Sequence, residues 1–356
     1  MRVACSIEKS YSCIGKERKN ITLEVGVIER IRFGKTDLEV SPLVLGTWVT
    51  GGWAWGGSDE KESLAAILKS LELGINFIDT APVYGFGKSE QIVGQAIRQW
   101  GRETVVVATK CGLEWDDKQR IRRNSSPERI SQEVDDSLKR LGVDCIDLYQ
   151  IHWPDPATSF EDSMKTLLKV QEQGKIRYIG VSNFIRGQLE RIMRHGEVYS
   201  LQPPFNMFER EAEKDALPFC LERGVATLAY GGLCRGLLTG KFKGNETFPR
   251  GDLRRADPKF KPDQFKKYVS AVDGIKPIAA SYGKSPAQFA LRWALHQPGI
   301  TCVIAGARTP RQAEDNAGAT GWSIRPEDLR RVDEILSEKI QEPLSPEFMA
   351  PPKEKE

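Results

Sequence analysis

The chain has 356 residues, of which 40% are hydrophobic and 28% are charged; this is typical of a globular protein and excludes fibrous, collagenous and disulfide-scaffold classes. With 52 Lys and Arg residues against 49 Asp and Glu, the net charge is +3, too balanced for a surface that binds nucleic acid. No apolar run approaches the roughly 18 residues of a membrane span and the first ten residues lack a signal-peptide core, so we expect a cytoplasmic protein without a membrane partner.

The amino-terminal region divides into two parts. Residues 1–28 show no clear periodicity, and we expect a disordered extension there. The next segment, ERIRFGKTDLEVS at 29–41, alternates around a Gly-Lys-Thr-Asp turn and predicts a β-hairpin. Because this hairpin begins naturally near Val27, an upstream translation start is an open alternative for the extension.

Eight short apolar runs follow, and amphipathic helical patterns separate most of them. The runs cover residues 43–48, 77–81, 105–110, 145–153, 176–184, 200–206, 225–230 and 302–308. Helical spacing of apolar residues occurs at 59–73, 89–100, 127–141 and 160–173. Strands that alternate with helices pair in parallel. The pattern therefore predicts an α/β fold, a single (β/α)8 TIM barrel over residues 29–340 whose bottom is closed by the hairpin.

Two later segments depart from a plain barrel. The interval between the seventh and eighth strands is about seventy residues long and includes the polar stretch 241–265. Loops of this length are usually functional lids. The polar tail at 341–356 is rich in Pro, Lys and Glu, and we expect it to be disordered.

Four residues with acid-base chemistry fall at the carboxyl ends of consecutive strands, where barrels of this kind carry their active sites. Asp79 ends the second strand in NFIDTAPVYG, and Tyr84 follows in the same loop. Lys110 ends the third strand and His152 the fourth, in DLYQIHWPDP. An ammonium at the end of a valine run needs a partner, which Asp79 can supply. We expect this ammonium to lower the pKa of Tyr84, making it an acid near neutral pH, and His152 to orient a carbonyl oxygen.

Each of these residues taken alone also has an ordinary structural explanation. Asp79 could cap a helix or turn, and Lys110 could be a loop charge. Tyr84 could serve packing, and His152 could be a core histidine with satisfied hydrogen bonds. The four complementary groups together, at the mouths of consecutive strands, favour a catalytic site.

The same motifs resemble the aldo-keto reductase superfamily. The resemblance is carried by NFIDTAPVYG, the strand-ending Lys110, IHWPDP and the later IGVSNF, and it extends from about Ile31 to about Ile340. It also includes GTWVTGG at 46–52 and NMFERE at 206–211, which are most similar to a bacterial branch that also resembles potassium-channel β subunits. The resemblance implies that Tyr84 is the general acid, that Lys110 and Asp79 tune it, and that His152 positions the substrate.

The resemblance also implies a nicotinamide cofactor, NADPH, extended across the barrel mouth. Arg308 lies where the family binds the adenosine 2'-phosphate, which is why we favour NADPH, with NADH as an open alternative. Ser182, Asn183 and Gln202 match the positions that hold the carboxamide, and Tyr230 matches the residue that stacks on the nicotinamide. The other positions carried over are Gly46, Thr47, Trp48 and Asp79; Gly231, Leu233, Arg235 and Gly236 for the pyrophosphate; and Gly306, Gln312, Asp315 and Asn316 around the adenosine. Lys241 and Arg254 in the long loop could close over the pyrophosphate, with ordinary surface charge as the alternative.

Aromatic residues on loops at the same mouth indicate the substrate end. These residues are Trp53, Trp55, Phe86, Trp115 and Trp153. An aromatic rim suits an apolar or ring-bearing carbonyl compound, although ordinary loop packing explains any one of them equally well. The seven cysteines are scattered without CxxC pairs, which fits reduced thiols, and we expect no metal site.

The sequence therefore predicts an NADPH-dependent oxidoreductase of the cytoplasm that interconverts small-molecule aldehydes or ketones and their alcohols. The alternative is a regulatory subunit that binds NADPH, as the channel β subunits do. His152 favours the enzyme, because the channel-type proteins have asparagine at that place in the motif. Physiological substrate, reaction direction and oligomeric state are not readable from the sequence.

Overall fold

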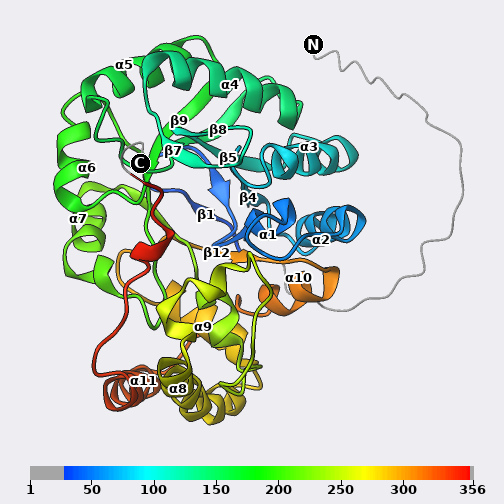
Figure 1. The fold of residues 1–356 in the computed structure, drawn as a ribbon, viewed down its shortest axis with the longest axis vertical. Coiled ribbons are helices and arrows are strands. Elements are labelled where there is room, and N and C mark those ends of the chain that lie inside the picture. The colour runs from blue at the N-terminus through cyan, green and yellow to red at the C-terminus, as the bar shows by residue number, and fades with distance from the viewer. Residues whose placement is uncertain (1–27, 353–356) are drawn as a thin grey trace, which may run out of the picture.

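The computed structural model of the protein describes residues 28–352, so the disorder predicted for the amino-terminal extension falls, apart from Ile28, outside the described residues. Eight parallel strands close into a barrel, which confirms the predicted TIM-barrel fold (Figure 1). In spatial order the ring runs β10-β11-β12-β3-β4-β5-β8-β9. The strands are β3 (Leu43–Gly46), β4 (Phe77–Asp79), β5 (Val106–Cys111), β8 (Ile146–Ile151), β9 (Ile176–Ser182), β10 (Ser200–Gln202), β11 (Ala226–Ala229) and β12 (Cys302–Gly306).

Helices surround this ring (Figure 1). They are α1 (Trp48–Gly51), α2 (Glu60–Glu72), α3 (Lys88–Trp100), α4 (Pro127–Leu141), α5 (Phe160–Glu172), α6 (Arg186–Ile192), α7 (Ala216–Arg223), α8 (Pro262–Ser281), α9 (Pro286–Leu295), α10 (Pro310–Ala317) and α11 (Pro326–Lys339). The four helices predicted from apolar spacing are confirmed as α2, α3, α4 and α5. Helices α8 and α11 are additions to the barrel and pack against each other.

Local sequence signals set the ends of several helices. Helix α4 begins after Ser126, whose side chain caps it, and has Pro127 as its first residue. It ends at Gly142, which adopts the left-handed conformation that glycine permits. Helix α9 begins with a reciprocal capping box between Ser285 and Gln288. These caps satisfy backbone groups that a helix end leaves without partners.

The predicted hairpin is confirmed and lies across the amino-terminal end of the barrel. Its strands β1 (Ile31–Arg32) and β2 (Glu39–Val40) pair antiparallel. Phe33 in its turn is fully buried and meets Phe77 of β4 edge to face, with ring centroids 5.4 Å apart. Phe33 also belongs to a cluster of buried residues from the barrel strands. The hairpin therefore closes the bottom of the barrel with apolar side chains.

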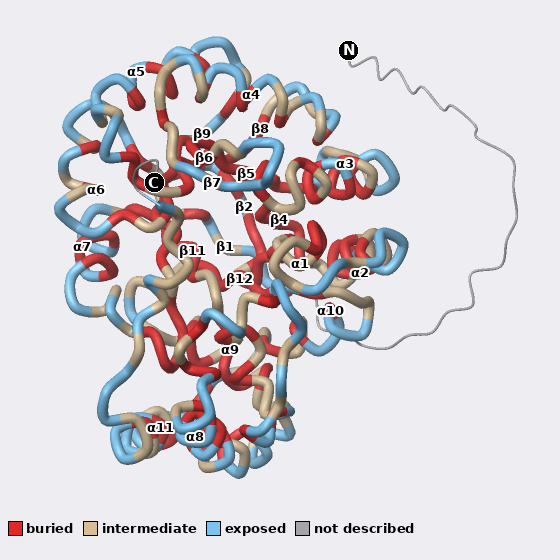
Figure 2. Tube along the Cα trace, viewed as in Figure 1, coloured by how far each residue is buried: buried red, intermediate tan, exposed pale blue. Residues whose placement is uncertain are grey.

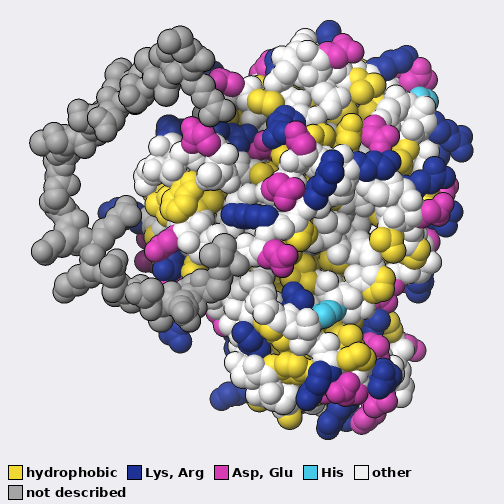
Figure 3. Space-filling model, turned by 180° about the vertical axis from the view of Figure 1, so that it is seen from behind, with side chains coloured by type: hydrophobic (Ala, Val, Ile, Leu, Met, Phe, Trp, Pro, Cys, Tyr) yellow, Lys and Arg dark blue, Asp and Glu magenta, His cyan; other side chains and the backbone are white. Residues whose placement is uncertain are grey.

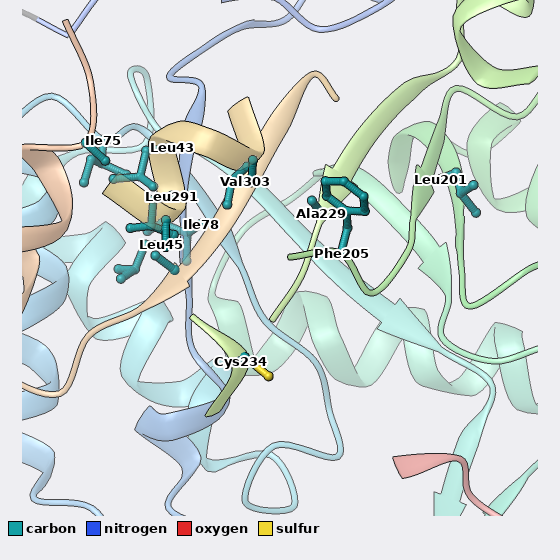
Figure 4. Packing of buried hydrophobic residues seen from close by; sticks show 14 of the residues in the cluster. Leu43, Leu45, Ile75, Ile78, Leu201, Phe205, Ala229, Cys234, Leu291 and Val303 are labelled. Carbon is teal, nitrogen blue, oxygen red and sulfur yellow. The ribbon is translucent and has the colours of Figure 1, made fainter. Parts of the chain in front are cut away.

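The larger core lies between the barrel and its helices. Figure 2 shows buried residues concentrated along the strands and on the inward faces of the helices. Figure 4 shows side chains of this cluster from β3, β4, β12 and α9, among them Leu45, Ile78, Val303 and Leu291. A third, smaller cluster forms around Ala81, Val83 and Leu113, next to the loops that carry Tyr84 and Trp153.

The long interval between the last two barrel strands contains more regular structure than predicted. It holds α8, α9 and three short 3-10 helices, η2 (Cys234–Thr239), η3 (Leu253–Arg255) and η4 (Pro258–Phe260). A hydrogen bond holds the polar stretch across the barrel mouth: the backbone N–H of Leu253 donates to the carbonyl oxygen of Ala54 at 2.9 Å. This segment is therefore a folded cover rather than a plain loop.

The disorder predicted for the carboxyl-terminal tail is wrong as far as Pro352. Residues 342–352 are described and include a 3-10 helix, η5 (Glu347–Met349). In Figure 1 the tail runs from α11 across the barrel toward the strand labelled β7 (Ile121–Arg123), which pairs with β6 (Leu113–Trp115). Its polar composition misled the prediction, because the tail is held by hydrogen bonds to residues far away in the sequence.

The outer surface carries basic and acidic side chains side by side, as the rear view in Figure 3 shows. Mixed charges of this kind are typical of a solvated surface. Within residues 28–352, no helix combines the length and the apolar character needed to cross a membrane.

The packing of the hairpin against the bottom of the barrel leads to a prediction about stability. Replacing Phe33 with Ala removes a fully buried ring, and we expect a loss of about 3–5 kcal/mol in the free energy of unfolding, measured in urea. Ile185→Ala is the control, because Ile185 is 66% exposed and its loss should change stability by about 0.5 kcal/mol or less. Equal effects of the two substitutions would show that the hairpin does not seal the barrel.

Candidate active site

A cavity of about 610 Å³ lies at the carboxyl ends of the barrel strands. Residues that end four different strands line it, namely Gly46, Asp79, Gln202 and Gly306. Most of the predicted site residues share this cavity: besides these four, it is lined by Thr47, Trp48, Trp55, Tyr84, Tyr230, Gly231, Leu233, Arg235, Gly236, Lys241, Arg254, Arg308, Gln312, Asp315 and Asn316. Segments from both halves of the chain thus meet at one place.

A buried ion pair forms the floor of one end of this cavity. The Lys110 side chain is fully buried, and its Nζ donates to Asp79 Oδ2 at 2.7 Å and to the carbonyl oxygen of Thr80 at 2.9 Å. The same Nζ lies 3.3 Å from the hydroxyl oxygen of Tyr84. Burial lowers the pKa of Lys110, and the charge of Asp79 opposes that change. The three side chains predicted from the sequence are therefore in direct contact.

Two amides hold the other oxygen of Asp79. Gln202 Nε2 donates to Oδ1 at 2.8 Å, and Gln150 Nε2 does so at 3.3 Å. Gln150 was missed in the sequence, although a polar residue in the middle of the apolar run DLYQIHW was a usable signal. It is fully buried and pairs in register with Lys110 on the neighbouring strand. Gly180 leaves it room, because a Cβ there would lie 2.9 Å from Gln150 Cγ.

The expectation that Lys110 lowers the pKa of Tyr84 is wrong for this arrangement. Burial raises the pKa of Tyr84 well above its usual value, and the negative charge of Asp79 raises it further. The ammonium does not reverse this, because Asp79 at 2.7 Å already balances its charge. Tyr84 is therefore a protonated phenol throughout the neutral range, which suits a proton donor.

His152 lies beside this group and is uncharged. Its ring and that of Tyr84 have centroids 5.8 Å apart and meet edge to face. Burial lowers the pKa of His152 well below its usual value, and the nearby charge of Lys110 lowers it further. A neutral imidazole can donate one hydrogen bond to a carbonyl oxygen without protonating it.

Two glycines place the loop that carries Tyr84. A Cβ on Gly51 would lie 2.4 Å from the carbonyl carbon of Tyr84, so only glycine allows α1 to approach this loop so closely. Gly85 has a φ of +68° and meets Gly51 from the opposite side, where a Cβ would lie 2.3 Å from its carbonyl oxygen. Backbone contact between these segments therefore fixes the position of Tyr84 at the carboxyl ends of the barrel strands.

Ser182 and Asn183 lie beside the cavity and hold its side together. Ser182 Oγ donates to the carbonyl oxygen of Gln202 at 2.9 Å. Asn183 Nδ2 donates to the carbonyl oxygen of His152 at 2.9 Å, and its Oδ1 accepts from the hydroxyl of Tyr230 at 2.8 Å. These bonds link the ends of β8, β9, β10 and β11, so both residues support the lining rather than form it.

The opposite end of the cavity carries excess positive charge. Lys241 and Arg308 form no ion pair with an acidic side chain of residues 28–352, whereas Arg254 pairs with Asp252 at 2.6 Å. Burial and the repulsion of Arg254 and Arg308 lower the pKa of Lys241. Burial and Arg254 likewise lower the pKa of Arg308. Cations held together in a half-buried site fit an anionic ligand such as phosphate.

Comparison with known proteins assigns the chain to a family. The model of the Aldo/keto reductase family matches residues 42–337. The chain belongs to this family. It is 46% identical over 331 residues to the aldo-keto reductase YhdN of Bacillus subtilis, covering 92% of this chain and 100% of the relative. Members are oxidoreductases that use nicotinamide cofactors, so the resemblance seen in the sequence is confirmed.

Two further relatives bear on cofactor and substrate. The NADH-specific methylglyoxal reductase of Escherichia coli is 34% identical over 322 residues, covering 86% of this chain and 98% of that protein. The solved structure of the glycerol dehydrogenase AKR11B4 from Gluconobacter oxydans matches with 46% identity and a TM-score of 0.83, covering 90% of this chain and 99% of that one. The family thus includes proteins named for different cofactors and substrates.

One residue expected to contact the cofactor phosphates is engaged elsewhere in this aldo/keto reductase. The Arg235 guanidinium pairs with Asp257 at 2.8 Å and with both oxygens of Glu209, the nearer at 2.5 Å. Lys259 adds a second cation to Glu209 at 2.8 Å. Arg235 therefore lines the cavity with a guanidinium that carboxylates already neutralise, and its expected place at the pyrophosphate stays a prediction.

The predicted aromatic rim splits into two groups. Trp55 lies at the cationic end, where its carbonyl oxygen accepts from Arg308 Nη2 at 2.5 Å. Within the described residues, Trp53, Phe86, Trp115 and Trp153 lie off the cavity lining. Trp53 contacts Phe86 and Phe86 contacts Trp115, with ring centroids 5.6 and 5.5 Å apart. The second group flanks the Tyr84 loop, and the contact of all five aromatic residues with a substrate stays a prediction.

The close approach of α1 to the Tyr84 loop can be tested by adding one carbon. We expect Gly51→Ala to move Tyr84 away and to lower kcat/KM by roughly 10²-fold, because misplacement of about 1 Å has that effect on catalysis. Gly187→Ala in α6 is the control, since its Cβ meets nothing within 4 Å. Unchanged activity in Gly51→Ala would show that this contact does not set the geometry of the site.

Proposed function

We propose that the protein is an NADPH-dependent carbonyl reductase in which Tyr84 is the general acid and base. The observation that carries the proposal is one cavity with two chemically different ends. A protonated, half-buried phenol in contact with an ammonium lies at one end, and two cations without acidic partners among residues 28–352 lie at the other. NADPH fits this division, because its phosphates would suit the cationic end and its nicotinamide would be held beside the phenol.

When bound, the cofactor supplies the hydride that the carbonyl carbon accepts. The chain supplies the remaining steps. His152 donates a hydrogen bond that orients and polarises the carbonyl oxygen. Tyr84 gives its hydroxyl proton to that oxygen, so the carbonyl gains a hydride and a proton and becomes an alcohol. Lys110 Nζ, 3.3 Å from the hydroxyl, donates a hydrogen bond to the phenolate that remains, which offsets part of the opposition from burial and Asp79 until a proton from solvent replaces the one transferred.

The proposed substrate is a small, uncharged aldehyde or ketone, or the matching alcohol in reverse. Tyr84 is flanked by the neutral ring of His152 and by Trp48, whose ring stacks on it with centroids 5.8 Å apart. Such surroundings favour neutral molecules. The names of the E. coli and Gluconobacter relatives, a methylglyoxal reductase and a glycerol dehydrogenase, support small oxygenated compounds.

Tyr84→Phe tests the role of the phenol. We expect kcat to fall roughly 10²- to 10⁴-fold while the Kd for NADPH stays within about twofold, because the change removes a proton donor and no binding group. The raised pKa of Tyr84 also predicts a pH profile for the unchanged enzyme: carbonyl reduction should persist through neutral pH and fall only at alkaline pH, whereas alcohol oxidation should rise with pH. Substantial turnover by Tyr84→Phe would exclude this assignment.

Arg308→Ala tests the choice between the two cofactors. Loss of a charge-assisted hydrogen bond to the 2'-phosphate should weaken NADPH roughly 10- to 100-fold and leave NADH almost unchanged, as measured by cofactor fluorescence titration. Arg255→Ala is the control on the same cover, because that side chain lies outside the cavity lining of the described residues. Equal losses for both cofactors would place the 2'-phosphate site elsewhere and remove the reason for preferring NADPH.

The decisive assay follows the absorbance of reduced nicotinamide with a panel of aldehydes, ketones and sugars, then with alcohols in reverse. Oxidation of NADPH that depends on a carbonyl supports the enzyme. Tight binding of NADPH without turnover in either direction would instead support the regulatory subunit considered from the sequence.

A further inference from the structure

We propose that Arg235 is a positioning residue that couples closure of the carboxyl-terminal tail to occupation of the cofactor end of the cavity. The part of the tail that docks is residues 344–352, which we call the strap. The inference rests on the proposed function in taking NADP(H) as the ligand. It assigns to Arg235 a role that explains why its guanidinium is buried and neutralised rather than exposed to phosphates.

The strap begins on the helices outside the barrel. The backbone N–H of Leu344 donates to the hydroxyl of Tyr268 in α8 at 3.1 Å. The carbonyl oxygen of Ser345 accepts from Lys259 Nζ at 3.5 Å. Lys259 is fully buried and pairs with Glu209 at 2.8 Å. The first residues of the strap therefore touch the same ion cluster that holds Arg235.

The middle of the strap lies on Arg235 itself. The Phe348 ring centroid is 5.7 Å from Arg235 Cζ, a cation–π contact. The next residue, Met349, lines the cavity together with Arg235 and Gly236. Arg235 and Gly236 have positive φ values of 54° and 88°, so this turn depends on the contacts that hold it.

The end of the strap is held on the other side of the mouth. Arg123 Nε and Nη2 donate to the carbonyl oxygen of Pro351 at 3.2 and 3.0 Å. Arg123 Nη1 also donates to the carbonyl oxygen of Pro154 at 2.9 Å, and its guanidinium lies 5.2 Å from the Trp153 ring centroid. Pro154 lies two residues after His152, so the strap joins the cofactor side of the site to its catalytic side.

Coupling follows from this arrangement. Arg235 is held by two carboxylates, lines the cofactor end through its turn, and offers its face to Phe348. If a ligand binds the turn of Arg235 and Gly236 more tightly when the strap is docked, its binding must shift the strap toward the docked state. By thermodynamic reciprocity, a docked strap must then raise cofactor affinity by the same factor.

Two substitutions separate this role from direct contact. Phe348→Leu keeps an apolar side chain but removes the ring over Arg235, and we expect the Kd for NADP+ to rise roughly fivefold or more. Met349→Leu at the neighbouring position tests direct contact with the cavity, because it keeps volume there and leaves the ring in place. Glu347→Gln is the matched control, since that side chain is exposed and is not among the residues that line the cavity in the described part of the chain. A rise in Kd for Met349→Leu alone would show that the strap acts only as a direct contact and would overturn the proposal.

Hydrogen exchange followed by mass spectrometry measures the other half of the coupling. In the unchanged protein, saturating NADP+ should slow exchange of the peptide that covers the strap at least severalfold, and Phe348→Leu should abolish that change. If NADP+ binds but strap exchange does not change, the coupling is wrong while the proposed function stands. If NADP+ does not bind at all, both proposals fail. The readout does not depend on turnover.

Discussion

The buried ion pair of Lys110 and Asp79 is the constraint around which the rest of the site is arranged. An ammonium with no exposed surface is tolerated only with a close counter-charge and further hydrogen bonds, which Asp79 and the carbonyl oxygen of Thr80 provide. The carboxylate in turn needs donors for its second oxygen, and these come from Gln150 and Gln202 on two other strands. One pair thereby ties β4, β5, β8 and β10 together under the phenol of Tyr84.

Burial and the two charges of the pair together set the protonation states of the neighbouring side chains. Burial keeps Tyr84 protonated and His152 uncharged; the charge of Asp79 adds to the first effect and that of Lys110 to the second, so two neutral hydrogen-bond donors lie beside the ion pair. The opposite end of the same cavity is charged, since Lys241 and Arg308 lack acidic partners among residues 28–352. This separation suits a single extended ligand whose phosphates and reactive ring would lie in different environments.

Most of the fold and the centre of the site could be predicted because both depend on short stretches of sequence. Alternating apolar runs and helical spacing gave eight strands in order, and parallel strands bring their carboxyl ends to one face. That geometry alone brings Asp79, Tyr84, Lys110 and His152 together. Gln150 escaped notice because it lies inside an apolar run, where its role depends on Gly180 of the next strand leaving it space.

The sequence by itself determined which elements form and which acid-base residues stand at the strand ends, since both follow from local patterns. Only the tertiary structure decided the charge state of Tyr84, the neutralisation of Arg235 by Glu209 and Asp257, and the docking of the carboxyl-terminal tail on Arg123. These properties depend on burial and on distances between segments far apart in the chain. A polar tail looks disordered in a sequence because its hydrogen-bond partners appear only when the barrel has brought them together.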